Sequence, residues 1–323
     1  MSFAMRVHRP GGPEVLSWEQ VEVGRPGEGQ VRLRHKAVGL NFVDVYHRTG
    51  LYPAPTPFAL GQEGAGEVVE VGASVKELRV GDRVAYAGLM GAYSEERLAP
   101  ADRLVKLPEG ISFEQGAAMM LKGMTVEYLL RRTRPLRAGE TILFHAAAGG
   151  VGLIACQWAR ALGATTIGTV STRQKAELAR AHGCHHAIVT SEEDFVARVR
   201  EITDRKGVPV AYDSVGKDTW QGTLECLQPR GLWVAFGNAS GKVPPLDLVV
   251  LSQKGSLFVT RPTLASYTGT RGDLLESANA LFERVLKGDV KIEINQRYPL
   301  AEAAQAHRDL EARKTTGSTV LTV

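Results

Sequence analysis

The chain has 323 residues, 44% of them hydrophobic and 23% charged, and its 39 basic and 35 acidic residues give a net charge of +4. At roughly 150 residues per domain this length predicts two domains, and the composition excludes a largely disordered chain. The most apolar window, residues 142–159, contains His145, Gln157 and three glycines. It is therefore not expected to span a membrane, because such a helix needs about 20 apolar residues.

Cysteine content and charge distribution narrow the class further. The three cysteines, Cys156, Cys184 and Cys226, are odd in number and far apart, so a disulfide framework is not expected. Residues 1–10 lack the apolar core of a signal peptide. The basic stretch 131–137 is typical of a solvated helix end rather than of a nucleic-acid surface. The sequence therefore predicts a soluble, reduced, cytoplasmic protein with two domains and no membrane partner, and it shows no concentrated basic surface typical of a nucleic-acid binder.

Residues 3–110 have the pattern of β structure. Residues 31–34 alternate apolar and charged side chains, which is the period of a half-buried strand. Residues 66–72 form a short apolar run between glycines, and residues 81–86 begin with a turn and continue as a strand. Frequent glycine and proline favour a small irregular barrel or sandwich rather than helices.

The pattern changes near Ser112, where Ser112 and Gln115 form a capping-box pair before a helical stretch. Short apolar runs then alternate with amphipathic stretches. Strands are expected at 141–145, 165–170, 187–189, 208–213, 232–236 and 256–259, and helices at 151–162, 174–181, 194–203 and 218–227. A second capping box is expected at Ser171 and Gln174. Alternation of this kind predicts a doubly wound parallel sheet, and six strands complete a dinucleotide fold.

The C-terminal part predicts a return to the first domain. It contains an amphipathic helix to residue 287, a strand at 291–294, a helix at 301–311 and a strand at 318–323.

A glycine-rich loop follows the first strand of the predicted dinucleotide fold. Residues 146–152 read Ala-Ala-Ala-Gly-Gly-Val-Gly, an A-x-x-G-x-x-G form of the dinucleotide fingerprint, placed between strand and helix as that motif requires. Small residues let the backbone approach a pyrophosphate, and the helix N-terminus offers free N–H groups and partial positive charge.

The end of the next strand indicates which dinucleotide binds. NAD-specific folds place a carboxylate there for the ribose 2′-hydroxyl, but this chain has Ser171, Thr172, Arg173 and Lys175, and no acid before Glu177. Hydroxyls and bases suit a 2′-phosphate. The sequence therefore predicts NADP(H).

The order of these parts resembles the medium-chain dehydrogenase/reductase superfamily. The resemblance implies a GroES-like β-rich domain formed by residues 1–118 and 266–323, and a Rossmann domain with a doubly wound, parallel, six-stranded sheet formed by residues 119–265. The Gly-His-Glu motif of its zinc enzymes appears as Gly61-Gln62-Glu63, and no cysteine precedes Cys156. Zinc needs three or four N, S or O ligands, so no metal is expected. Glu63 has two possible roles: it orients a neighbouring residue of the active site without contacting the reactants, or it pairs with a base.

Within that superfamily the chain resembles the zinc-free, zeta-crystallin-like quinone oxidoreductases. The segments that carry the resemblance are 41–52 (N-x-x-D-x-Y-x-R-x-G-x-Y), 122–125, 211–216, 236–241 and 260–262. The resemblance implies NADPH as hydride donor, a quinone as acceptor, and a homodimer formed through the dinucleotide domain; transfer of single electrons in place of a hydride stays open.

The same resemblance implies roles for individual residues. Asn41 and Thr125 would lie near the nicotinamide, Ser171 and Lys175 would bind the 2′-phosphate, and Arg313 would reach a phosphate. The pyrophosphate loop would comprise Ala148, Gly149, Gly150, Val151 and Gly152, and the remaining cofactor contacts would be Ser214, Val215, Phe236, Gly237 and Asn238. The chain departs from the family at Thr190, where the family often has a tyrosine.

Tyr46 and Tyr52 are the candidate catalytic residues, because a phenol can donate a hydrogen bond to the developing phenolate while its ring lines an apolar slot. Core or rim aromatics would explain them equally, with water as the proton source. Two alternative functions stay open. One is an NADPH-dependent reductase of enone or alkenal double bonds. The other is an NADPH-binding structural or RNA-binding protein with little catalysis.

Overall fold

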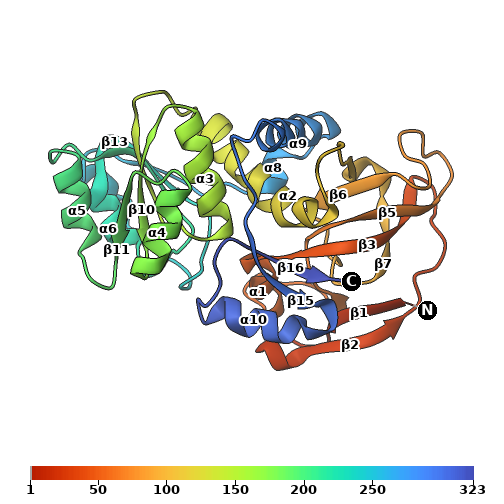
Figure 1. The fold of residues 1–323 in the computed structure, drawn as a ribbon. Helices are drawn as coiled ribbons and strands as arrows, with labels where there is room; N and C mark the ends of the chain where they lie inside the picture. Colours follow the sequence, from red (N-terminus) through yellow and green to blue (C-terminus); the bar gives the residue numbers. More distant parts are fainter. Residues whose placement is uncertain (1) are drawn as a thin grey trace. The chain divides into compact units, whose positions relative to one another are not determined.

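The computed structural model describes residues 2–323, and the chain divides into two compact units (Figure 1). Unit 1 comprises residues 2–124, Tyr267–Leu286 and Ile292–Val323, and unit 2 comprises Thr125–Ser266 and Lys287–Lys291. Helix α2 (Phe113–Glu127) and the short helix α8 (Leu264–Tyr267) each cross a boundary between the units.

Unit 2 is built on a six-stranded parallel sheet with the strand order β11-β10-β9-β12-β13-β14. The strands are β9 (Thr141–Phe144), β10 (Thr165–Val170), β11 (His186–Val189), β12 (Val208–Asp213), β13 (Leu227–Ala235) and β14 (Phe258–Thr260). This order is that of the dinucleotide fold, and the chain changes direction across the sheet between β9 and β12. Ligands bind such sheets at the carboxyl ends of the strands next to that point.

The helices of unit 2 alternate with its strands (Figure 1). They are α3 (Gly150–Ala161), α4 (Arg173–Ala181), α5 (Phe195–Ile202), α6 (Trp220–Cys226) and α7 (Val249–Gln253), and a π-helical segment, η3 (Tyr128–Thr133), extends α2. Gly163 and Gly183 have positive φ just after α3 and α4, the conformation expected at helix C-termini. The predicted fold class, a chain with a Rossmann sheet and a β-rich domain, is confirmed.

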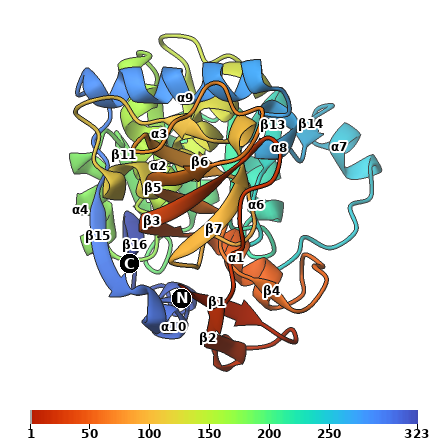
Figure 2. The ribbon, with the colours of Figure 1, turned by 90° about the vertical axis from the view of Figure 1, so that its right-hand side faces the viewer.

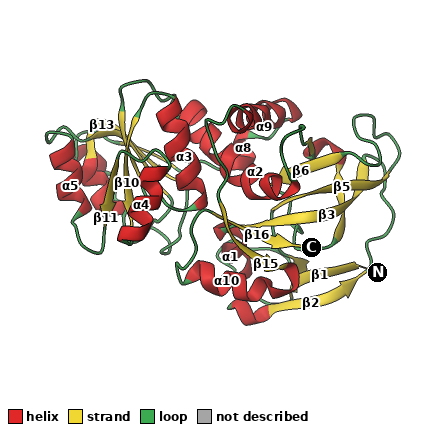
Figure 3. Ribbon diagram, viewed as in Figure 1, coloured by secondary structure: helices red, strands yellow, loops and turns green. Residues whose placement is uncertain are grey.

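Unit 1 is mostly β structure (Figure 3). A seven-stranded sheet has the order β15-β16-β3-β5-β6-β8, with β7 paired to β3, and a three-stranded sheet has the order β2-β1-β4. The strands are β1 (Ser2–Val7), β2 (Leu16–Val21), β3 (Gln30–Leu40), β4 (Phe58–Ala59), β5 (Glu63–Val71), β6 (Arg83–Ala87), β7 (Glu96–Pro100), β8 (Val105–Lys106), β15 (Ile294–Pro299) and β16 (Ser318–Thr322). Apolar residues from both sheets form one buried cluster that includes Val7, Leu33, Val68 and Leu321.

The helices of unit 1 are α1 (Phe42–Arg48), α9 (Arg271–Leu286) and α10 (Ala303–Glu311), with 3-10 turns η1 (Pro13–Val15), η2 (Ala101–Arg103) and η4 (Leu300–Glu302). The predicted C-terminal return is confirmed, because β16 pairs antiparallel with β3, with Thr319 opposite Leu40 (Figure 2). The Ser112 and Gln115 capping box before α2 is also confirmed, with reciprocal hydrogen bonds of 2.9 and 3.1 Å.

Three local predictions were wrong. Residues 3–110 contain a helix, α1, which Asn41 caps and whose Asp44 accepts a hydrogen bond from the Asn41 backbone N–H at 2.9 Å. Helix α4 is capped by Thr172, whose hydroxyl accepts from the Lys175 N–H, rather than by Ser171. The strand expected at 291–294 lies at Ile294–Pro299, because β16 fixes its register there.

Candidate functional site

The glycine-rich loop lies at the carboxyl edge of the unit 2 sheet. The Ala147 N–H donates to the Thr169 carbonyl at 3.0 Å, which ties the loop to β10, and Gly149 is the N-cap of α3. A Cβ on Gly152 would lie only 2.6 Å from the carbonyl carbon of Ala147, so this position needs glycine. The first-turn N–H groups of a helix have no partner within it. Ala148, Gly149, Gly150, Val151 and Gly152 therefore form a cradle that fits a pyrophosphate.

Ser171 and Lys175 lie together after β10, in the turn and first helical residues that lead into α4. Arg173 is beside them and forms an ion pair with Glu192 at 2.9 Å. The sequence shows no acid near Arg173, but the fold brings Glu192 there from the segment after β11. The charge of Arg173 is thus partly compensated by a neighbouring carboxylate.

Thr190 occupies the position where the family often has tyrosine. Its hydroxyl donates to the Val170 carbonyl at 3.1 Å, and the neighbouring Ser191 hydroxyl donates to the Ser171 carbonyl at the same distance. These two hydrogen bonds therefore tie the ends of β10 and β11 together at Val170 and at Ser171, a predicted 2′-phosphate residue.

The ends of β12 and β13 interlock around Asp213, which is fully buried. One of its carboxylate oxygens accepts from the N–H groups of Val215 and Gly216, at 2.8 and 3.1 Å, and its carbonyl accepts from the Phe236 N–H at 2.8 Å. A Cβ on Gly237 would lie 2.8 Å from the Cα of Ser214. The structure thus brings together the predicted cofactor residues of the two strand ends, Ser214, Val215, Phe236, Gly237 and Asn238.

Asp213 was missed as a site residue, although its position at the end of an apolar strand was visible in the sequence. A charged residue there must be paired, because burying an uncompensated carboxylate is costly.

His145, at the end of β9, is a core residue. Its two ring nitrogens lie 2.9 Å from the hydroxyls of Thr169 and Thr223, and burial lowers its pKa. Because both nitrogens are engaged, neither is available to a metal ion.

The predicted residues of unit 1 gather around α1. Asn41 is buried and caps the helix. Tyr46 is 7% exposed, and its ring centroid lies 5.2 Å from that of Tyr52 in a T-shaped pair. The Tyr52 N–H also donates to the Tyr46 carbonyl at 2.9 Å, so the two tyrosines contact each other through both their rings and their backbones.

Glu63 lies behind Asn41 and is fully buried. It accepts hydrogen bonds from the Asn41 side-chain amide at 2.8 Å and from the Leu121 N–H at 2.7 Å. The Lys122 ammonium lies 3.2 Å from the same carboxylate. The contacts of Glu63 fit both roles left open for it, because it accepts from Asn41 and also pairs with the base Lys122. Lys122 was missed, although it belongs to the 122–125 motif.

The two other predicted residues lie elsewhere in their units. Thr125 is buried on α2, and Arg313 is exposed, with a φ of 59°, in the turn after α10.

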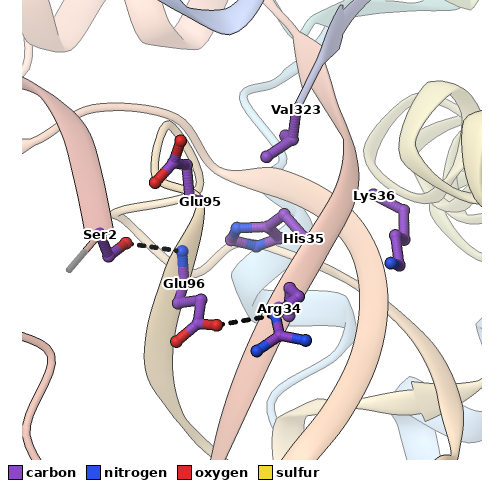
Figure 4. Close-up of a pocket in the computed structure, with 7 residues that line it drawn as sticks. All are labelled: Ser2, Arg34, His35, Lys36, Glu95, Glu96 and Val323. Atoms are coloured by element: carbon purple, nitrogen blue, oxygen red, sulfur yellow. Dashed lines mark hydrogen bonds and ion pairs between the residues drawn. The ribbon is translucent and has the colours of Figure 1, made fainter.

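A pocket in unit 1 lies apart from these residues. It is lined by Ser2, Arg34, His35, Lys36, Glu95, Glu96 and Val323 (Figure 4), none of which is a predicted site residue. The Glu96 backbone N–H donates to the Ser2 hydroxyl, and the Arg34 guanidinium donates to the Glu96 carboxylate (Figure 4).

No cluster of three or more His, Cys, Asp or Glu residues that could hold a metal ion occurs within residues 2–323. Over the same residues, no helix has the length and apolar character required to cross a bilayer.

Comparison with known proteins places this arrangement in a family. The alcohol dehydrogenase GroES-like domain matches residues 27–109, and the zinc-binding dehydrogenase domain matches residues 150–283. The quinone oxidoreductase of Pseudomonas aeruginosa is 60% identical over 96% of each chain. A 2-haloacrylate reductase from a Burkholderia species is 49% identical over 99% of each chain.

The solved structures agree. The Escherichia coli quinone oxidoreductase complexed with NADPH has 51% identity and a TM-score of 0.98, and the match covers 99% of this chain and 100% of that one. As the motifs predicted, the chain belongs to the quinone oxidoreductase family of the medium-chain dehydrogenase/reductase superfamily.

Proposed function

We propose that this protein is an NADPH-dependent quinone reductase. It transfers a hydride from NADPH to a quinone, which also takes up a proton to give the hydroquinone and NADP⁺. The observation that carries the proposal is the glycine cradle of unit 2 followed by Ser171 and Lys175, in a chain that matches the NADPH complex of the Escherichia coli quinone oxidoreductase over its whole length.

NADPH supplies the hydride, and the protein supplies binding and orientation. The α3 cradle would hold the pyrophosphate, Ser171, Lys175 and Arg313 would hold phosphate, and the β12 and β13 ends would line the nicotinamide side. The fit rests on the close backbone approach at Gly152 and Gly237, where no side chain fits, and on the first-turn amides of α3.

We assign Asn41 and Thr125 to the nicotinamide end, and Tyr46 and Tyr52 to the quinone. Reduction makes the quinone aromatic and places negative charge on its oxygen, so a phenol donor would stabilise the transition state. The T-shaped Tyr46 and Tyr52 pair brings two aromatic rings into contact, with their centroids 5.2 Å apart.

The test is an oxidation screen of NADPH and NADH with 1,4-benzoquinone, 9,10-phenanthrenequinone and a small enone. The expected result is rapid NADPH oxidation by the quinones and slow NADH oxidation. Tighter binding of NADH than of NADPH would overturn the cofactor assignment. Tight NADPH binding without turnover of any acceptor would instead favour a structural or RNA-binding protein.

A second candidate function is NADPH-dependent reduction of an activated carbon–carbon double bond. The specific observation is the 49% identity to a 2-haloacrylate reductase over nearly the full length of both chains. Enones and quinones both present a conjugated carbonyl to the same hydride. Faster turnover of the enone than of either quinone in the same screen would favour this candidate.

We also propose a homodimer formed through unit 2. Strand β14 is at the edge of the parallel sheet, and it carries Phe258 and Val259, which are 60% and 39% exposed. Leu248 and Val249, before and at the start of α7, are 73% and 55% exposed. An exposed apolar edge is a pairing surface. Phe258→Glu should produce a monomer in sedimentation analysis with NADPH binding retained, and a monomeric native protein would refute the dimer.

We also propose that the two domains comprise residues 1–118 with 266–323 and residues 119–265. We further propose that hydride transfer needs no metal and that the protein is cytoplasmic. All three cysteines are free and buried, which suits a reducing compartment. Stoichiometric zinc in an elemental analysis would contradict the metal-free site.

A further inference from the structure

A buried ion pair supports Asn41 from within unit 1. Glu63 is 0% exposed and Lys122 is 6% exposed, and the Lys122 ammonium lies 3.2 Å from a carboxylate oxygen of Glu63. The Asn41 amide nitrogen donates to that same oxygen at 2.8 Å. The other oxygen accepts from the Leu121 N–H at 2.7 Å. The Glu63 carboxylate therefore accepts from three donors: Asn41, which follows β3, and Leu121 and Lys122 on α2.

This arrangement determines the orientation of the Asn41 amide. An amide group has a donor nitrogen and an acceptor oxygen, and it can turn over if its surroundings accept both orientations. An ionised carboxylate only accepts, so it fixes the nitrogen of Asn41 toward Glu63. The oxygen of Asn41 then faces the N-terminus of α1, where the side chain accepts from the Asp44 N–H in the capping box.

The surroundings leave Glu63 no alternative position. A Cβ on Gly39 would collide with the Glu63 carboxylate and with the Ala117 carbonyl, so glycine at position 39 makes room for the carboxylate. A second carboxylate, Asp44, lies within electrostatic range. Burial raises the pKa of Asp44 to about 7, Lys122 opposes that rise, and Glu63 adds to it.

Burying this pair is not explained by stability alone. The cost of removing two charges from water can exceed their attraction, and apolar replacements of buried pairs are often neutral or stabilising. A buried pair that also directs a polar side chain beside it is more simply explained by that side chain's function.

We propose that Glu63 is a positioning residue, with Lys122 as its counter-ion, that fixes the Asn41 amide, with its nitrogen toward Glu63 and its oxygen toward α1, at the nicotinamide end of NADPH. The inference rests on the proposed function, in which Asn41 contacts the cofactor. The Lys122 ammonium lies 3.2 Å from the Glu63 carboxylate and is its counter-ion. Neither residue needs to touch NADPH or the quinone.

The test is a double-mutant cycle between the pair and Asn41. Glu63→Gln adds an NH₂ group that must face one of the three donors, so the purely accepting partner that holds the Asn41 amide together with the α1 cap is lost. Because Glu63→Gln alone leaves a buried cation unpaired, the main variant is Glu63→Gln combined with Lys122→Met. This neutral pair keeps the side-chain volumes.

The readouts are the hydride-transfer rate in stopped-flow experiments, with 4-deuterated NADPH to identify that step, and the Kd of NADPH. We expect the neutral pair and Asn41→Ala each to slow hydride transfer by about 10- to 100-fold, the size of effect that misplaced groups cause. Added to Asn41→Ala, the neutral pair should change neither readout by more than about twofold, since coupled residues are not additive.

A merely structural role would give equal losses in both backgrounds, and that additive result would overturn the inference. An Asn41→Ala protein with unchanged rate and Kd would also overturn it. If the native protein failed to oxidise NADPH with every acceptor tested, the proposed function would fail. The Kd of NADPH, measured in the same double-mutant cycle, would still decide the inference.

The control is Arg132→Met combined with Arg131→Met, which removes both cations, 2.8 and 3.3 Å away, from another fully buried glutamate, Glu127. This variant should lower thermal stability and leave both readouts of the cycle unchanged. A loss of hydride transfer as large as that of the neutral pair would show that any broken buried pair has this effect, and would overturn the inference.

Discussion

Arg48 on α1 donates a hydrogen bond to Nδ1 of His307 on α10 across 3.0 Å, although 259 positions separate the two residues. Because a guanidinium only donates, Nδ1 accepts, and a neutral His307 carries its proton on Nε2. That nitrogen lies 3.2 Å from the Tyr93 hydroxyl, which donates to Asp44 at 3.0 Å. A directed chain of buried hydrogen bonds thus connects α10 to both ends of the helix that carries Tyr46.

This chain makes folding stability depend on pH. Burial lowers the pKa of His307 to about 3, so between pH 6.5 and 3 the unfolded chain binds a proton that the folded protein excludes. Stability from this group is therefore lost as pH falls below 6.5. Burial raises the pKa of Asp44 to about 7, which has the opposite sign: its contribution is present at low pH and is lost as pH rises through 7.

We therefore expect His307→Gln to gain stability relative to the native protein as pH falls, because the native protein loses the His307 contribution while both proteins keep the opposite contribution of Asp44. Going from pH 7 to pH 5, the His307 contribution should cost the native protein about 2 kcal/mol that the variant does not lose. Urea unfolding at both pH values measures this difference, with His8→Gln on the exposed surface as the control. Parallel curves for the native protein and His307→Gln would contradict a neutral buried His307.

The charges near β10 should determine the preference between the cofactors. Lys175→Ala removes a positive charge from the predicted 2′-phosphate site, so NADPH binding should weaken by about tenfold or more, while NADH binding should stay within about twofold. Fluorescence titration with both cofactors measures this, and an equal loss for both would remove Lys175 from the 2′-phosphate site.

Glu192 provides the complementary test, because it pairs with Arg173. Glu192→Gln frees Arg173 and removes a carboxylate near the 2′-phosphate, so NADPH affinity should increase, by about two- to fivefold for an exposed pair. Weaker NADPH binding would show that Glu192 helps to build the site.

The sequence predicted the elements of unit 2 well, because parallel strands buried on both faces give apolar runs that glycines and helix caps punctuate. It missed α1, a short helix whose signal lies in Asn41 and Asp44 rather than in hydrophobic periodicity. It also missed the Glu63 and Lys122 pair and the Arg173 and Glu192 pair, which depend on which segments the fold places side by side. The members of the first pair are 59 positions apart and those of the second 19, so no local sequence pattern indicates that they are in contact.

Gly152 should be intolerant of a side chain. A Cβ there would meet the backbone of Ala147 at 2.6 Å, and backbone cannot move aside as a flexible side chain can. Gly152→Ala should therefore lower the free energy of unfolding by about 1–3 kcal/mol and weaken NADPH binding. Gly272→Ala on α9, whose Cβ would have only a hydroxyl 3.7 Å away, is the control and should be close to neutral.

The Tyr46 and Tyr52 pair makes a direct prediction about catalysis. Tyr52→Phe keeps the ring, and with it the T-shaped contact to Tyr46, but removes the hydroxyl that would stabilise the developing phenolate. If this hydroxyl acts in the transition state, turnover with a quinone should fall by more than about tenfold with an unchanged Kd for NADPH. Tyr46→Phe, measured beside it, distinguishes the two phenols. An unchanged turnover in Tyr52→Phe would remove Tyr52 from the mechanism, and unchanged turnover in both variants would leave water as the source of the proton.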